Sequence, residues 1–158
     1  MKIFNAADIV QFAVRIEEEG EAFYRKAAQD SRDKDTQDLF SFLANEEVQH
    51  KALFREMLSK MEALQPAETY DGEYAAYLSD YIDGKAVFTK DVQQELAPDT
   101  RDTLSAIIFA MQREADSILY YHEAKQFIAE KHYSIIDKII IEERKHFSKL
   151  SELRKKYV

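Results

Sequence analysis

Two stretches of the sequence, NEEVQHKALF at residues 45–54 and IEERKHFSKL at residues 141–150, share one pattern. Each contains a glutamate followed three residues later by a histidine, and apolar residues recur around this pair at the spacing of one helix face. Residues three apart lie on the same face of an α-helix, so both polar side chains lie on the buried side. The two pairs are Glu47 with His50 and Glu143 with His146.

Four long segments of the chain show the periodicity of amphipathic helices. The 158 residues include only 3 glycines and 2 prolines, which predicts few turns and therefore few, long elements. A β-sandwich, a barrel or a Rossmann-type sheet needs more turns, so these folds are disfavoured. The loops within the first and second pair of segments are short, which predicts two antiparallel helical hairpins. We expect the helices at about residues 5–30, 35–62, 99–130 and 134–157.

The segment of about residues 65–98 connects the two predicted hairpins. It contains both prolines and two of the three glycines, and it is too long for a structureless loop, so we expect short helices within it. Four tyrosines form one face of such a helix, which we expect to pack on the bundle or on a second subunit: Tyr70, Tyr74, Tyr77 and Tyr81. Two hairpins joined by a long crossover predict an all-α, ferritin-like four-helix bundle, with residues 1–158 as a single domain.

Composition and charge exclude several classes of function. With 22 basic and 30 acidic residues, the formal net charge is −8, and we expect neither nucleic acid nor a membrane as a partner. The absence of cysteine excludes disulfides, thiol nucleophiles, cysteine-ligated zinc and iron–sulfur clusters. The first ten residues, MKIFNAADIV, lead into a charged helix without an apolar signal-peptide region, so we expect a cytoplasmic protein.

Glutamates also occupy the buried stripes of the other two helices, near the middle of each. Four carboxylates that converge in one bundle repel each other and lose their hydration, so protons or cations must neutralise them. Two divalent cations would balance the four negative charges, and carboxylate oxygens with imidazole nitrogens suit iron or manganese, with zinc as an alternative. The alternative interpretation is a metal-free bundle in which these residues are exposed or form salt bridges. The predicted two-metal site consists of Glu17, Glu47, His50, Glu114, Glu143 and His146.

The two halves of the chain repeat this pattern. Glu17 and Glu114 are each followed by a Glu-x-x-His glutamate, 30 and 29 residues later, and by a tyrosine seven residues later. A bundle with pseudo-twofold symmetry would bring these residues into a near-symmetric site. The tyrosines, Tyr24 and Tyr121, either donate a hydrogen bond to a ligand carboxylate or pack in the core with their hydroxyl groups satisfied elsewhere.

Acceptors for the two ligand histidines are expected next to the ligands. A metal-bound imidazole normally donates its second N–H group to an outer acceptor. A glutamate precedes each ligand glutamate, and we expect it to accept from the histidine of the opposite half, which pairs Glu46 with His146 and Glu142 with His50. The alternative is that both are plain surface glutamates. The remaining histidines lack a glutamate three residues before them and are expected at the surface: His122 and His132.

The four helical segments resemble the rubrerythrin branch of the ferritin-like superfamily. The resemblance rests on EEEGEAFYRKAA at residues 17–28, NEEVQHKALF, READSILYYHEA at residues 113–124 and IEERKHFSKL, and it does not extend to the crossover. It implies that the six predicted ligands hold two iron ions bridged by carboxylates. Rubrerythrins reduce hydrogen peroxide at a diferrous site, and relatives oxidise ferrous iron with oxygen, so the resemblance implies one of these activities.

The sequence departs from the rubrerythrin pattern at two points. The pattern of rubrerythrins with peroxidase activity has an extra carboxylate three residues after the third-helix glutamate, and this chain has Ser117 at that position. The ligand set that remains is symmetric and resembles that of bacterioferritin. Rubrerythrins usually carry a rubredoxin-like tail with four cysteines, and this chain contains none. We therefore expect the electron donor to be a separate protein, such as a rubredoxin-like protein.

Together these features predict a di-iron protein that reduces hydrogen peroxide or oxygen, with the metal ligands as its only catalytic residues. We expect a homodimer, and the long crossover also permits domain swapping between subunits. One alternative is a ferroxidase that handles or stores iron, and storage would need a closed protein shell. The other alternative is a metal-dependent sensor or a helical bundle without enzymatic activity.

Overall fold

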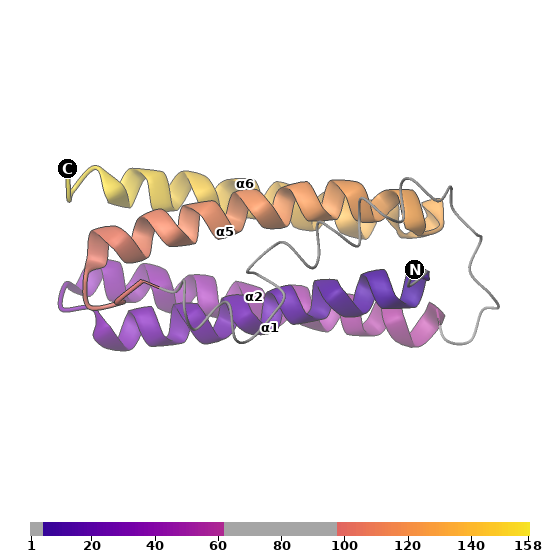
Figure 1. Ribbon diagram of the computed structural model, residues 1–158, viewed down its shortest axis with the longest axis horizontal. Coiled ribbons are helices and arrows are strands. Elements are labelled where there is room, and N and C mark those ends of the chain that lie inside the picture. Colours follow the sequence, from indigo (N-terminus) through magenta and orange to yellow (C-terminus); the bar gives the residue numbers. More distant parts are fainter. Residues whose placement is uncertain (1–4, 62–97) are drawn as a thin grey trace.

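A computed structural model of the protein describes residues 5–61 and 98–158, which form a bundle of four long helices (Figure 1). In chain order these are α1 (Ala6–Asp30), α2 (Lys34–Met61), α5 (Thr103–Ala124) and α6 (Tyr133–Arg154). No β-strand occurs within the two described ranges, and the predicted all-α fold is confirmed. The predicted short helices of the crossover, with their four tyrosines, lie outside the described residues. None of the described helices combines the length and the apolar content that a membrane span requires.

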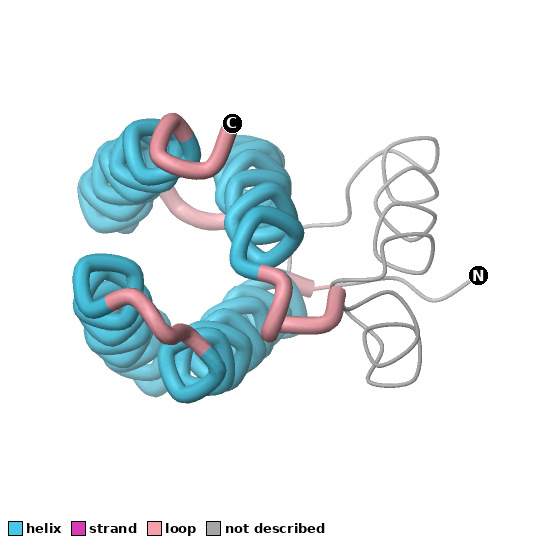
Figure 2. The backbone as a smooth tube through the Cα atoms, turned by 90° about the vertical axis from the view of Figure 1, so that its left-hand side faces the viewer, coloured by secondary structure: helices cyan, strands magenta, loops and turns pink. Residues whose placement is uncertain are grey.

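The helices pack as two hairpins, as the sequence predicts. The largest helix–helix interfaces are those between α1 and α2 and between α5 and α6, and in Figure 1 these pairs form the lower and the upper layer. Viewed along the bundle, the four helices surround a common interior (Figure 2). The buried stripes of all four helices therefore face one another.

Local sequence signals set the beginnings of α1 and α2. Asn5 and Asp8 form a capping box, in which the Asn5 side chain accepts from the Asp8 backbone N–H at 2.9 Å and the Asp8 carboxylate accepts from the Asn5 backbone N–H at 3.1 Å. The Asp33 carboxylate accepts from the backbone N–H of Thr36 at 3.0 Å, which satisfies a free donor in the first turn of α2. Both helices begin and end within one residue of the expected positions.

The third helix is shorter than the expected range of about residues 99–130. The segment before α5 is a turn, in which the Asp99 carboxylate accepts from the backbone N–H of Arg101 at 3.0 Å and from its guanidinium group at 2.6 Å. After Ala124 the chain turns a corner, because Ile128 has an extended backbone that cannot continue a helix. Apolar residues continue at helical spacing through this corner, so the sequence pattern did not indicate where α5 ends. Two short 3₁₀ helices form the corner, Lys125–Phe127 and Glu130–His132.

The fourth helix ends at Arg154, three residues before the expected end. The last residues form a turn that contacts the start of α2 in the other hairpin. The Tyr157 hydroxyl lies 2.6 Å from the Thr36 hydroxyl, and the Lys156 ammonium lies 2.6 Å from the Asp35 carboxylate. These tertiary contacts lie beyond the reach of a prediction from helical periodicity.

The interior consists of two hydrophobic clusters at opposite ends of the bundle. Ile9 and Ile139 belong to the first cluster, which holds the beginnings of α1 and α6 with the ends of α2 and α5. Phe40 and Leu150 belong to the second cluster, which holds the other half of each helix. The buried charged side chains occupy middle positions along the helices, so a polar layer separates the two clusters.

The two histidines outside the Glu-x-x-His pairs differ in exposure. His122 is exposed, as expected, and its Nε2 lies 3.4 Å from the guanidinium group of Arg144. His132 is only 7% exposed, so its expected place at the surface is wrong. The second 3₁₀ helix ends at His132, which lines a cavity together with Met57 and Ile135.

The Tyr120 hydroxyl donates a hydrogen bond of 2.7 Å to the Ile9 carbonyl and links α5 to α1 within the interior. We expect Tyr120→Phe to lower the free energy of unfolding by about 1 kcal/mol, because a buried hydrogen bond is lost with little change in packing. Urea unfolding followed by circular dichroism measures this difference. Tyr133→Phe, at a half-buried position, is the control, and an equal loss in both variants would contradict the interpretation.

Candidate metal centre

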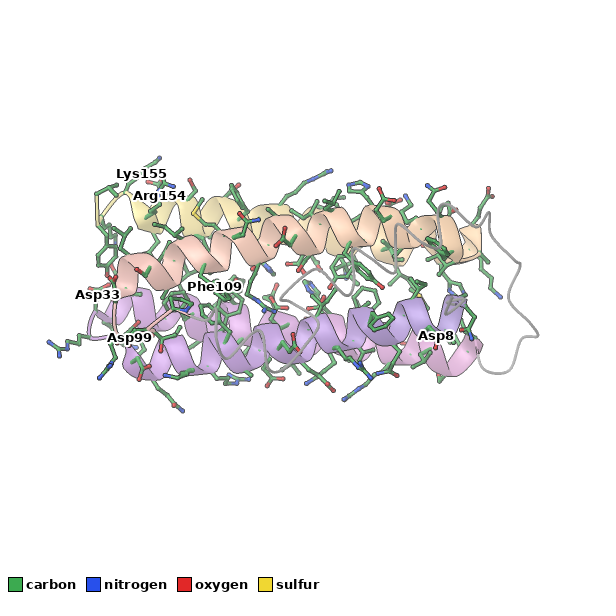
Figure 3. The ribbon with its side chains drawn as sticks, in the orientation of Figure 1. Asp8, Asp33, Asp99, Phe109, Arg154 and Lys155 are labelled. Atoms are coloured by element: carbon green, nitrogen blue, oxygen red, sulfur yellow. The ribbon has the colours of Figure 1, made fainter. Side chains whose placement is uncertain are left out.

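All six predicted ligands lie in the polar layer between the two hydrophobic clusters. α1 and α5 each contribute one glutamate, and α2 and α6 each contribute a glutamate and a histidine, all from the middle of the helix. Each of these residues is 5% exposed or less. Figure 3 shows the side chains that fill the space between the two hairpins. Because water cannot solvate these groups, their charges must be balanced inside the protein.

The ligand atoms fall into two groups of four, and within each group they lie within 4.8 Å of one another. Glu47 and Glu143 belong to both groups, so their carboxylates lie where each could bridge two cations. The remaining members are terminal, and each terminal pair comes from one hairpin. The first group is Glu17, Glu47, His50 and Glu143, and the second is Glu47, Glu114, Glu143 and His146.

Both imidazole rings present Nδ1 to the carboxylates. The Nδ1 atoms of His50 and His146 lie 3.1 Å and 2.8 Å from the two oxygens of Glu143. The same nitrogens lie 3.6 Å from Oε2 of Glu17 and 3.8 Å from Oε2 of Glu114, respectively. The rings stack with their centroids 5.6 Å apart. Nδ1 is therefore the nitrogen of each histidine that is placed to bind a cation.

The opposite ring nitrogens face the two outer glutamates, unequally. Nε2 of His50 lies 3.0 Å from Oε2 of Glu142, which is the hydrogen bond expected from the sequence. Nε2 of His146 lies 3.7 Å from Oε2 of Glu46, which is within range of an ion pair but too long for a hydrogen bond. The side chains of Glu46 and Glu142 are 24% and 27% exposed, so each links a buried imidazole to the surface.

Two buried tyrosines connect the hairpins at the terminal glutamates. Tyr24 on α1 donates a hydrogen bond to Oε1 of Glu114 on α5, and Tyr121 on α5 donates to Oε1 of Glu17 on α1. Burial and the nearby carboxylates raise the pKa of both hydroxyl groups well above 10, so both remain donors at neutral pH. Each bond leaves Oε2 available. Oε2 of Glu17 is buried and has no hydrogen-bond partner within the described residues.

The carboxylates strongly affect one another's protonation. Burial and the charges of neighbouring glutamates raise the pKa of Glu47 well above its ordinary value and that of Glu114 to about 8. Burial also acts to raise the pKa of Glu143, but hydrogen bonds from His146 and His50 outweigh it and lower this pKa. In the absence of a cation, the cluster therefore retains protons that neutralise part of its charge.

The two histidines are basic for the same reason. Burial acts to lower their pKa values, but hydrogen bonds and charges of the glutamates outweigh it and raise the pKa of His50 to about 11 and that of His146 to about 10. A cation would replace these protons. The donor set, three carboxylates and one imidazole in each group, and the unpaired Oε2 of Glu17 fit a pair of divalent metal ions.

Two residues at the cluster received no role from the sequence. Gly20 is buried in α1 and lies against Glu47, and a glycine inside a helix is a signal that could have been followed. Arg113 is 6% exposed and donates a hydrogen bond of 3.2 Å to the Ile16 carbonyl, which holds α5 to α1 next to Glu17. In the sequence, nothing distinguishes Arg113 from an ordinary surface arginine.

Comparisons with known proteins agree with this geometry. A family model described as Rubrerythrin matches residues 8–154. One solved structure, of a Thermotoga maritima protein proposed to be a ferritin-like diiron-carboxylate protein, is 26% identical and covers 100% of this chain and 99% of its own, with a TM-score of 0.72. No curated protein is significantly similar to the chain.

Loading the cluster with two divalent cations is expected to release at least two protons per chain at pH 7. The pKa values of His50 and His146, about 11 and about 10, mean that each ring carries a proton that the cation must displace. Calorimetric titration with Mn²⁺ in buffers of different ionisation enthalpy counts these protons, and the affinity should fall as the pH falls. His122→Ala, at an exposed position, should release the same number. A binding enthalpy that is equal in all buffers would refute this expectation.

Proposed function

The chain belongs to the rubrerythrin family, and from this premise we propose that it is a di-iron protein that reduces hydrogen peroxide or oxygen. The observation that supports this function best is that Glu47 and Glu143 belong to both ligand groups. Two cations in these groups would be neighbours that share both carboxylates. Two iron ions held by these residues would supply two electrons to one oxidant.

The donor set favours iron or manganese over zinc. Each group offers three carboxylates and one imidazole, and oxygen-rich sites with imidazole suit iron and manganese, whereas structural zinc sites are mostly built from cysteine and histidine. The charges also match, because two divalent cations neutralise the four glutamates. The structural relative proposed to be a diiron-carboxylate protein supports iron as the choice between these metals.

When bound, two ferrous ions supply one electron each, and with two protons they reduce one hydrogen peroxide to two water molecules. The residues of this chain prepare the site for that reaction. Tyr24 and Tyr121 hold the terminal carboxylates by Oε1 and leave Oε2 of each on the side of the histidine Nδ1 atoms, where it could bind a cation. The two hydrophobic clusters exclude bulk water from both sides of the polar layer. The Glu142 carboxylate accepts the Nε2 proton of His50 and so fixes this ring with Nδ1 inward.

A second candidate function is the oxidation of ferrous iron for iron handling. It is favoured by Ser117, which is 7% exposed and stands where the resemblance to peroxidase rubrerythrins implies a further carboxylate. Without that carboxylate, the two halves contribute equivalent ligands, one terminal glutamate and one histidine each. In this function, ferrous iron is the substrate, and oxygen or peroxide is the oxidant.

In the peroxide- or oxygen-reducing function, electrons must return to the site from outside the chain. The chain contains no cysteine and therefore no rubredoxin-type centre of its own. We propose a separate donor protein, such as a rubredoxin-like protein, and a homodimer as the assembly that it serves.

Anaerobic titration with ferrous iron, followed by stopped-flow mixing with hydrogen peroxide or oxygen, tests the proposed function. We expect saturation at about two irons per chain, because two ligand groups are present. Faster oxidation by peroxide than by oxygen would indicate a peroxidase of the rubrerythrin kind. Oxidation by oxygen at an equal or higher rate would indicate iron handling or oxygen reduction. No saturable uptake of iron would refute the di-iron assignment.

His50→Ala should reduce the bound iron from about two to about one per chain, because His50 belongs to the first ligand group only. The same variant should lose rapid oxidation by peroxide, since one ferrous ion supplies only one of the two electrons required. Iron content after desalting, measured by mass spectrometry, checks the first result. His122→Ala is the matched control at an exposed position, and it should retain both irons. Full loading of His50→Ala would contradict the assignment of this ligand.

A further inference from the structure

Gly20 lies in the interior of α1, three residues after Glu17, and its place in a helix is unfavourable in itself. Glycine destabilises a helix interior relative to alanine because it loses more backbone freedom on folding. It is the only glycine within residues 5–61 and 98–158, and no residue in these ranges has a positive φ. The backbone at position 20 therefore does not require glycine, and the reason must lie in the space around it.

The space that a side chain would occupy is taken by Glu47. A Cβ atom added at Gly20 would lie 2.9 Å from Oε2, 3.1 Å from Cδ and 3.4 Å from Cγ of the Glu47 side chain. Contacts below 3.0 Å are essentially never observed for Cβ atoms, so an alanine here requires the carboxylate to move. Glu47 is a flexible side chain, and it can turn away if nothing fixes its position.

The carboxylate that must move is one of the two shared by both ligand groups. The other three glutamates of the cluster accept hydrogen bonds from neighbouring tyrosine or histidine side chains. Glu47 lies beside the Glu17 carboxylate and against the bare backbone of Gly20 on the α1 side. Ser117 stands at the equivalent position of α5, three residues after Glu114, so the internal repeat alone does not demand a glycine.

We propose that Gly20 is a positioning residue of the metal centre, and that its missing side chain leaves the Glu47 carboxylate the space in which it belongs to both ligand groups. This inference rests on the proposed di-iron function, because only a bound cation pair needs Glu47 in that place. It assigns the glycine to metal binding and not to folding. Gly20→Ala should therefore separate the two properties, with weaker metal binding and an apo-protein that is no less stable.

The test is a calorimetric titration of the apo-protein with Co²⁺, a redox-stable probe, together with thermal unfolding of the apo-protein. We expect the wild-type chain to bind two Co²⁺ ions, and Gly20→Ala to bind at least about tenfold more weakly, the scale of effects of residues that orient metal ligands. The melting temperature of apo Gly20→Ala should equal or exceed that of the wild type, since alanine favours the helix and Glu47 is free to turn away.

Ala22→Gly is the matched control, an exposed position on the same helix with the reverse substitution. It should lower the apo melting temperature through helix propensity alone and leave the Co²⁺ affinity within about twofold of the wild type. An apo Gly20→Ala melting temperature that falls as much as that of Ala22→Gly would overturn the proposal, because the role of Gly20 would then be structural.

A double-mutant cycle with Glu47→Asp tests whether Gly20 acts through Glu47. The aspartate side chain is shorter by one methylene and removes the atom that lies 2.9 Å from the new Cβ, so Gly20→Ala should weaken Co²⁺ binding by less than about threefold in this background. Additive losses, or a Gly20→Ala affinity within twofold of the wild type, would overturn the inference and leave the metal centre itself intact. Absence of Co²⁺ binding by the wild type would overturn both the inference and the proposed function.

Discussion

The burial of four glutamates in one layer of a helical bundle is the constraint on which the rest of this structure depends. Carboxylates at the centre of the bundle lose their hydration and repel one another, so they persist only if positive charge or protons reach them. Two imidazoles meet part of this demand, and Glu143 accepts from both of them. Burial, together with the charge of the neighbouring Glu143, raises the pKa of Glu114 to about 8, so this carboxyl group favours a proton. A pair of divalent cations, as proposed above, would satisfy the same demand.

The architecture divides the work between the two hairpins. Each hairpin supplies one terminal glutamate and one histidine, and each extends one carboxylate that belongs to both ligand groups, Glu47 or Glu143, to the common centre. The hydrogen bonds of the two tyrosines connect the hairpins, because Tyr24 and Tyr121 each donate to the terminal glutamate of the opposite hairpin. The site is therefore complete only when the hairpins are packed together, and the hydrophobic clusters on both sides supply the energy of that packing.

The ligand set has approximate twofold symmetry, but the two halves of the chain differ in the distances from the histidines to the outer glutamates and in the small residue next to the cluster. Nε2 of His50 is hydrogen-bonded to Glu142, whereas the distance from His146 to Glu46 is 3.7 Å. Gly20 leaves room for the Glu47 carboxylate, whereas α5 has a serine at the equivalent position. Two cations held here would have unequal surroundings even though their ligand types are equal. Unequal surroundings are one route to two metal positions with different affinities and potentials.

The sequence by itself determined the four long helices, their pairing into hairpins and the polar positions in the buried stripes, because helical periodicity is a local property of the chain. It did not determine where the third helix ends, since buried apolar residues continue through the corner that follows Ala124. Only the tertiary structure decided which carboxylates are shared, which glutamate each tyrosine reaches, and that His132 is buried. It alone also revealed the contact between Gly20 and Glu47. These features depend on the distance and rotation between neighbouring helices, and no spacing within a single helix encodes either of them.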